Sequence, residues 1–169
     1  MAREQNLYSA SYLRNFVFGV EDSLVSTVGL LSGVSIAGVG ARAILITGII
    51  LVFVEAFSMA VGSFLSEHSA EGYLRQTEAP FAFPITSGGI MFVSYFFSGF
   101  IPLFPYIFLT PGNALWYSIG LSLAALFVLG IIGAKLSKTN IWKGSLRMAS
   151  IGGIAIAVGV AIGRVAGAF

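Results

Sequence analysis

The chain has 169 residues, of which 57% are hydrophobic and only 9% are charged, and its formal net charge is +2. Soluble domains carry about 25% charged residues, so this composition excludes an ordinary water-soluble domain. The apolar runs are continuous rather than alternating, which disfavours a membrane β-barrel. The composition therefore predicts an all-α integral membrane protein whose size suits a single helical bundle.

Residue counts also narrow the possible chemistry. The chain contains no cysteine and one histidine, His68, which excludes thiolate metal sites and disfavours multi-histidine metal or haem sites. The polar N-terminal segment lacks the features of a cleaved signal peptide, so we expect the first apolar run to stay in the mature protein. No Walker loop, nucleophile elbow or HExxH motif occurs. We therefore expect no enzyme activity, no tightly bound cofactor and no binding of nucleic acid.

Five apolar runs are long enough to cross a bilayer. Residues 1–14, which precede them, can form a short amphipathic helix at the membrane surface. Pro102 and Pro105 are expected to kink or end the third span, because proline removes a backbone donor. We expect one transmembrane domain over residues 1–169, with spans at roughly 16–37, 43–66, 85–108, 114–134 and 146–167.

Basic residues near the ends of the spans predict the orientation. If the N-terminus is cytoplasmic, seven basic residues lie on the cytoplasmic side and two lie on the far side. This distribution satisfies the positive-inside rule, so we expect a cytoplasmic N-terminus and a C-terminus on the far side. The seven are Arg3, Arg14, Arg75, Lys135, Lys138, Lys143 and Arg147, and the two are Arg42 and Arg164.

The first span contains two adjacent acids, Glu21 and Asp22. An ionised carboxylate within hydrocarbon costs at least about 2.5–3.5 kcal/mol, so such residues usually serve a function. The two side chains point about 100° apart around a helix. Asp22 is the stronger ligand candidate because Ser26 lies on its face, whereas Glu21 is a further candidate that could instead face a headgroup or an arginine.

The second span carries a stripe of residues spaced four apart, which place their side chains on one helical face. Counting at about 1.5 Å per residue from Arg14 and Glu67 puts Asp22 level with Met59, and Glu55 deeper. Carboxylate oxygens with one thioether favour Fe²⁺ or Mn²⁺ over Mg²⁺ or Ca²⁺. Carboxylates can also exchange a metal for a proton. The stripe consists of Glu55, Met59, Ser63 and Glu67.

The end of the second span supplies a second acidic cluster. Glu67, His68 and Glu71 lie within one helical turn and could capture metal at the cytoplasmic mouth. The plainer interpretation is a solvated helix end in which Arg75 pairs with an acid. Packing is likewise the commonest role of a methionine such as Met59.

Four blocks of the chain resemble the vacuolar iron transporter family. They are FGVEDSLVSTVGLLSGV, EAFSMAVGSFLS, SGFIPLFPY and GSLRMASIGGIAIAVGVAIGR, in the family's order. Asp22 matches the aspartate of the family's first helix. Met59 matches the methionine of its SMAxGE block, in which Ser63 replaces the glutamate. The chain is similar to the shorter, nodulin-like branch, which lacks the glutamate-rich cytosolic domain.

The resemblance implies a five-helix homodimer that exports Fe²⁺, and also Mn²⁺, from the cytoplasm by proton antiport. We expect a multi-pass protein of the cell membrane in a prokaryote, or of a vacuolar or other organelle membrane in a eukaryote. The alternatives are transport of Co²⁺, Ni²⁺ or an organic cation, and a non-transporting membrane scaffold. The expected metal site comprises Asp22, Ser26, Glu55, Met59, Ser63, Glu67, His68 and Glu71, with Glu21 as a further candidate.

Overall fold

The computed structural model describes the backbone of residues 2–78 and 80–168, and the side chains of these residues from Leu7 onward. The side chain of Arg3 lies outside the described residues. Five helices in the described part of the chain are long and apolar enough to cross a membrane. The prediction of an all-α protein with five membrane helices is confirmed. The helices are α1 (Ala2–Ile36), α2 (Ala41–Arg75), α3 (Ala82–Leu103), α4 (Pro105–Phe108), α5 (Pro111–Leu136) and α6 (Ile141–Ala166).

Helices α1 and α2 are longer than a bilayer requires. Each has 35 residues, which corresponds to about 52 Å against a hydrocarbon core of about 30 Å. The sequence predicted a separate surface helix in the N-terminal segment. The segment instead forms the first turns of α1. The reason is local, because neither glycine nor proline occurs among the first 18 residues to interrupt the helix.

Prolines divide the third predicted span into two helices. Pro102 lies inside α3, and Pro105 begins the short α4 as its first residue. Proline lacks the N–H group that would continue the helical ladder, so the chain turns between Leu103 and Pro105. Ser118 of α5 donates a hydrogen bond of 2.7 Å to the carbonyl oxygen of Pro102. A hydroxyl thus satisfies a backbone acceptor that the interrupted helix leaves free.

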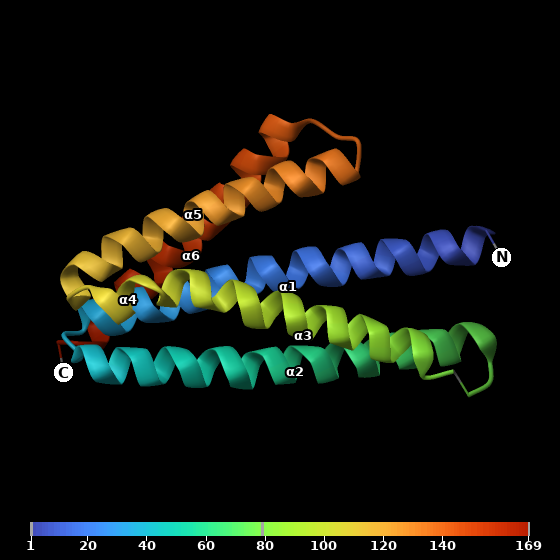
Figure 1. The fold of residues 1–169 in the computed structure, drawn as a ribbon, viewed down its shortest axis with the longest axis horizontal. Helices are drawn as coiled ribbons and strands as arrows, with labels where there is room; N and C mark the ends of the chain where they lie inside the picture. The colour runs from blue at the N-terminus through green and yellow to red at the C-terminus, as the bar shows by residue number, and fades with distance from the viewer. Residues whose placement is uncertain (1, 79, 169) are drawn as a thin grey trace.

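Figure 1 shows the helices as two groups that share α1. Helices α1, α2 and α3 run side by side over a long distance, and α5 and α6 form a hairpin that leans away from them toward its turn. Helix α1 packs against α2, α3, α5 and α6. The two chain termini lie at opposite ends of the molecule, and the long helices extend further toward the N-terminal end than the α5–α6 turn does.

The contact between α1 and α6 depends on glycines. A Cβ atom built on Gly159 would lie 2.2 Å from the carbonyl oxygen of Gly29, and one on Gly163 would lie 2.2 Å from that of Gly33. The two backbones therefore touch directly. Small residues allow such an approach in a membrane, where helices associate through packing rather than through the hydrophobic effect. The structure places this glycine contact within one chain.

We expect Gly163→Ala to lower the free energy of unfolding by about 1–3 kcal/mol, because the new methyl group forces two backbones apart. Gly153→Ala on the same helix is the matched control, since a Cβ there meets nothing within 4 Å. It should be neutral or stabilise the helix by up to about 1 kcal/mol. Thermal unfolding of the purified variants in detergent measures both effects. Equal melting temperatures for the two variants would contradict the packing assigned to Gly163.

Candidate functional site

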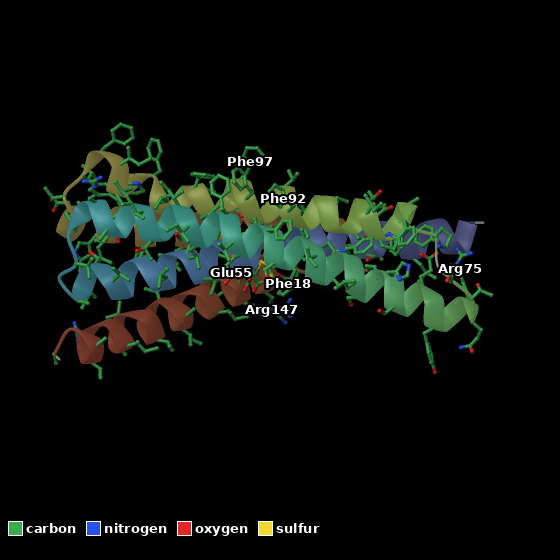
Figure 2. All side chains as sticks on the ribbon, turned by 90° about the horizontal axis from the view of Figure 1, so that it is seen from below. Phe18, Glu55, Arg75, Phe92, Phe97 and Arg147 are labelled. Atoms are coloured by element: carbon green, nitrogen blue, oxygen red, sulfur yellow. The ribbon has the colours of Figure 1, made fainter. Side chains whose placement is uncertain are left out.

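Asp22 of α1 and Glu55 of α2 are the two acids that the membrane-embedded part of the bundle brings together. Their carboxyl groups are near enough to interact electrostatically, and both also act on the hydroxyl of Tyr95 in α3. Each acid is only partly buried. Figure 2 places Glu55 near the middle of the bundle's length, far from Arg75 at one end. Neither acid forms an ion pair with any side chain that the structure describes.

Asp22 lies opposite a different residue of α2 from the one that the sequence predicted. In the structure, Ser11 donates a hydrogen bond to Glu67, and the Ser63 hydroxyl donates one of 3.0 Å to the side-chain oxygen of Asn15. Because α1 and α2 are antiparallel, these two contacts set the register of the pair. Asp22 then faces Ala56, one residue from Glu55.

The predicted level of Asp22 with Met59 was off by about one turn because it assumed that Arg14 lies level with Glu67. Side chains on a helix point back toward its N-terminus, and arginine is long. Arg14 therefore reaches back along α1 to meet Glu67, which shifted the estimate by about one helical turn. Met59 lies one turn closer to the N-terminal end of the bundle than Glu55.

Tyr95 is the residue next to this acidic pair that the sequence analysis missed. Its side chain is fully buried, and its hydroxyl lies 2.8 Å from that of Ser26. Ser23 donates a hydrogen bond of 2.7 Å to the Tyr95 carbonyl oxygen. These bonds tie α1 to α3 beside Asp22. The sequence did contain a signal for this residue, because a tyrosine and several serines occur within an otherwise apolar span.

Glu67 sits in a polar cluster nearer the N-terminal end of the bundle. Its carboxylate forms an ion pair with Arg14 and accepts hydrogen bonds from Ser11 and Asn15. The side chain of Glu67 is only 10% exposed, whereas that of Arg14 is 66% exposed. The buried charge is therefore satisfied by its own chain.

Glu71, one turn further along α2, belongs to the same cluster. One of its carboxylate oxygens accepts hydrogen bonds from Tyr8 at 3.0 Å and from the Nε atom of Arg75 at 2.9 Å. The other oxygen is buried and has no hydrogen-bond partner among the described residues. A cavity of about 570 Å³ lies beside this carboxylate and is lined by Glu67 and Glu71, by the arginines that pair with them, and by Phe83. We call this space the acidic cavity.

His68 does not join the acids with which the sequence grouped it. Its ring stacks on Phe81 at a centroid distance of 5.0 Å and on Phe64 at 6.0 Å. Glu21 is partly buried and forms no ion pair within the described part of the chain. Among the described residues, no group of three or more histidine, cysteine, aspartate or glutamate side chains could hold a metal ion.

The arrangement places carboxylates inside a bundle of membrane helices. Carboxylate oxygens are ligands for divalent cations, and acids within a membrane usually mark an ion or proton path. The acidic cavity at one end and the Asp22–Glu55 pair further along both lie between α1 and α2. The fold and these acids define a multi-pass membrane protein with ionisable groups inside its bundle.

The chain belongs to the VIT family, whose model matches residues 13–79 and 71–164. "Vacuolar iron transporter homolog 3" of Arabidopsis thaliana is 28% identical over 88% of this chain and 80% of its own length. "VIT-like transporter 1b" of Glycine max is 26% identical over 96% of the chain and 79% of its own length. "Vacuolar iron transporter cccA" of Arthroderma benhamiae is 37% identical over 43% of the chain and 29% of its own length. The predicted short form of the family is confirmed, since α2 and α3 are joined by residues 76–81 alone.

We expect Arg14→Leu to lower the free energy of unfolding by about 1–3 kcal/mol, because it leaves the buried Glu67 carboxylate without its charged partner. The double variant Arg14→Leu/Glu67→Leu should recover much of that loss, since a buried pair can be replaced by apolar side chains at little cost. Arg42→Leu, at an exposed position in the first turn of α2, is the control. Thermal unfolding of the variants in detergent tests this double-mutant cycle. Strictly additive effects of the two substitutions would refute the coupling between Arg14 and Glu67.

Proposed function

We propose that this protein exports Fe²⁺, and also Mn²⁺, from the cytoplasm by exchange for protons, and that it works as a homodimer. The observation that carries the proposal is the meeting of Asp22 and Glu55 from two antiparallel helices within the membrane, with no ion-pair partner among the described residues. Membership of the VIT family supports it, as do relatives named as vacuolar iron transporters.

The residues next to the acidic pair favour a transition metal. Met59 lies one turn from Glu55 on the same stripe of α2 and is half-buried, so its thioether is in reach of the same path. Sulfur raises the preference for softer cations, while carboxylates replace the water that a cation loses on entering the membrane. Fe²⁺ and Mn²⁺ therefore suit this donor set better than Mg²⁺ or Ca²⁺.

A second copy of the chain would complete the site. Two carboxylates and one thioether are too few ligands to surround a divalent cation. Because Asp22 and Glu55 are only partly buried within one chain, a two-fold axis beside α1 and α2 would bring together two such sets. The apolar face of α2 near Glu55, which exposes Phe53, Val54 and Phe57, would lie beside that axis or against lipid.

Proton exchange follows from the chemistry of the pair. When a cation leaves Asp22 and Glu55, two neighbouring carboxylates remain in a medium of low dielectric constant. Protons taken up from the far side neutralise them, and the next metal ion displaces those protons. Movement of metal in one direction is thereby coupled to movement of protons in the other.

The acidic cavity would serve as the cytoplasmic entrance in the orientation that the positive-inside rule predicts. Glu71 has a buried oxygen with no partner among the described residues, which can receive a cation. Glu67 would become available when Arg14 swings away, since that guanidinium is mostly exposed. His68, stacked on Phe81 at the edge of the same segment, would contribute only after turning from its aromatic partners.

We expect Asp22→Asn and Glu55→Gln each to reduce Fe²⁺ uptake into proteoliposomes at least tenfold, because an amide binds a divalent cation far less well than a carboxylate. Glu78→Gln removes the same charge from the exposed turn after α2 and should leave uptake unchanged. An iron-sensitive dye inside the vesicles reports the rate. Uptake by both site variants at the wild-type rate would overturn the assignment.

Proton exchange predicts that an acidic vesicle interior accelerates Fe²⁺ entry, and that each burst of entry makes the interior more alkaline. A protonophore should remove the acceleration, and Asp22→Asn should remove both signals. Parallel measurements with Mn²⁺, Co²⁺, Ni²⁺ and Mg²⁺ define the selectivity. A rate of uptake that does not depend on the pH gradient would contradict antiport. A clear preference for Co²⁺ or Ni²⁺ would show that one of these ions, rather than Fe²⁺, is the substrate.

A further inference from the structure

A second cavity, of about 410 Å³, lies between the N-terminal half of α1 and the turn that joins α5 to α6. Arg14 of α1 and Arg147 of α6 line it, together with the hydroxyl-bearing residues Ser137 and Thr139 of the turn. The other described residues of its wall are apolar, and none is an acid. We call this space the basic cavity, because two arginines and no acid line it, whereas two acids and two arginines line the acidic cavity.

The surroundings of the basic cavity are also positive. Segment 135–147 carries four basic residues and no acid, and all seven acids of the chain precede residue 79. Arg147 forms no ion pair with any described side chain, while Arg14 lines both cavities and pairs with Glu67. The four basic residues of the segment are Lys135, Lys138, Lys143 and Arg147.

The level of the cavity points to the membrane surface. Trp142, five residues before Arg147, is 76% exposed, and exposed tryptophan is typical of the boundary between lipid and water. Leu13, Val17 and Met148 form an apolar part of the cavity wall. A ligand here would meet positive charge and apolar surface together, which an inorganic anion does not need but a phospholipid does.

Glycines, which have no side chain, line part of the basic cavity. A Cβ atom on Gly133 of α5 would meet nothing within 4 Å, so this glycine is not required by packing. In contrast, a Cβ on Gly130 one turn earlier would lie 2.5 Å from the Cα atom of Ser145, so that glycine serves the contact between α5 and α6. Gly133 instead leaves the wall of the cavity open.

We propose that the basic cavity binds the phosphate headgroup of an anionic phospholipid from the cytoplasmic leaflet. Arg147 and Arg14 bind the phosphate oxygens through charge-assisted hydrogen bonds, and Ser137 and Thr139 donate further ones. An acyl chain lies along the apolar wall beside Met148. This lipid site is inferred without reference to the proposed transport of metal, although Arg14 lines both cavities.

Native mass spectrometry of the purified protein in neutral detergent tests the proposal. Phosphatidylglycerol should form adducts and raise the melting temperature, whereas phosphatidylcholine with the same acyl chains and inorganic phosphate should do neither. Arg147→Gln should weaken phosphatidylglycerol binding about fivefold. Gly133→Leu, which fills the cavity without changing charge, should weaken it as well. Lys135→Gln removes the same charge from a residue outside the cavity wall and should bind as the wild type does.

Wild-type binding by both Arg147→Gln and Gly133→Leu would refute the site. Equal losses in Arg147→Gln and Lys135→Gln would show diffuse surface attraction instead, and equal binding of phosphatidylcholine would remove the anionic requirement. A shift produced by inorganic phosphate alone would replace the lipid with a soluble anion. Gel filtration and thermal unfolding without lipid establish that each variant is folded. If Arg147→Gln does not fold, the binding of phosphatidylglycerol by Gly133→Leu decides whether the site exists.

Discussion

The direct contact between the backbones of α1 and α6 is the constraint on which the rest of the molecule depends. It holds α1 along one side through Gly33 and Gly163, while hydrogen bonds that join Ser23 and Ser26 to Tyr95 hold it along another. A helix fixed on both sides cannot rotate freely. The direction of Asp22 toward α2 is therefore a result of packing by neighbours that carry no acid themselves.

The acids of the chain divide into two environments with different chemistry. Glu67 and Glu71 are held by arginines and hydroxyls of their own chain. Asp22 and Glu55 have each other and the hydroxyl of Tyr95 nearby. A cation approaching from the N-terminal end would thus meet carboxylates that already have partners before it meets carboxylates without an ion pair among the described residues.

The sequence predicted the fold well because a membrane leaves few alternatives. Backbone groups in lipid must be satisfied within helices, so hydropathy alone identifies the five long helices. It also identified Asp22 and Glu55, since an acid inside an apolar run is conspicuous. The register between α1 and α2 was wrong by about one turn, because it depends on how far the Arg14 side chain reaches, and periodicity carries no information about that reach.

Other parts of the site could not be predicted because they join distant segments. Tyr8 and Glu71 are 63 positions apart, and no local spacing relates them. His68 was grouped with Glu71 by its position on α2. Its ring instead stacks on Phe81, which follows the turn after α2. A helical face specifies which side chains share a direction, and the neighbouring helix decides what each one contacts.

The unequal lengths of the helices have a mechanical consequence. Helix α1 is clamped at Gly33 against α6, but its N-terminal turns project beyond the α5–α6 turn (Figure 1). Ser11 lies 22 residues from that clamp, or about 33 Å, so a tilt of about 5° moves it by about 3 Å. That displacement breaks a hydrogen bond such as the one from Ser11 to Glu67. A tilt about the glycine contact is therefore opposed at the N-terminal turns by contacts with α2 and α3, such as the hydrogen bond from Ser11 to Glu67 and the stacking of Tyr8 on Phe83.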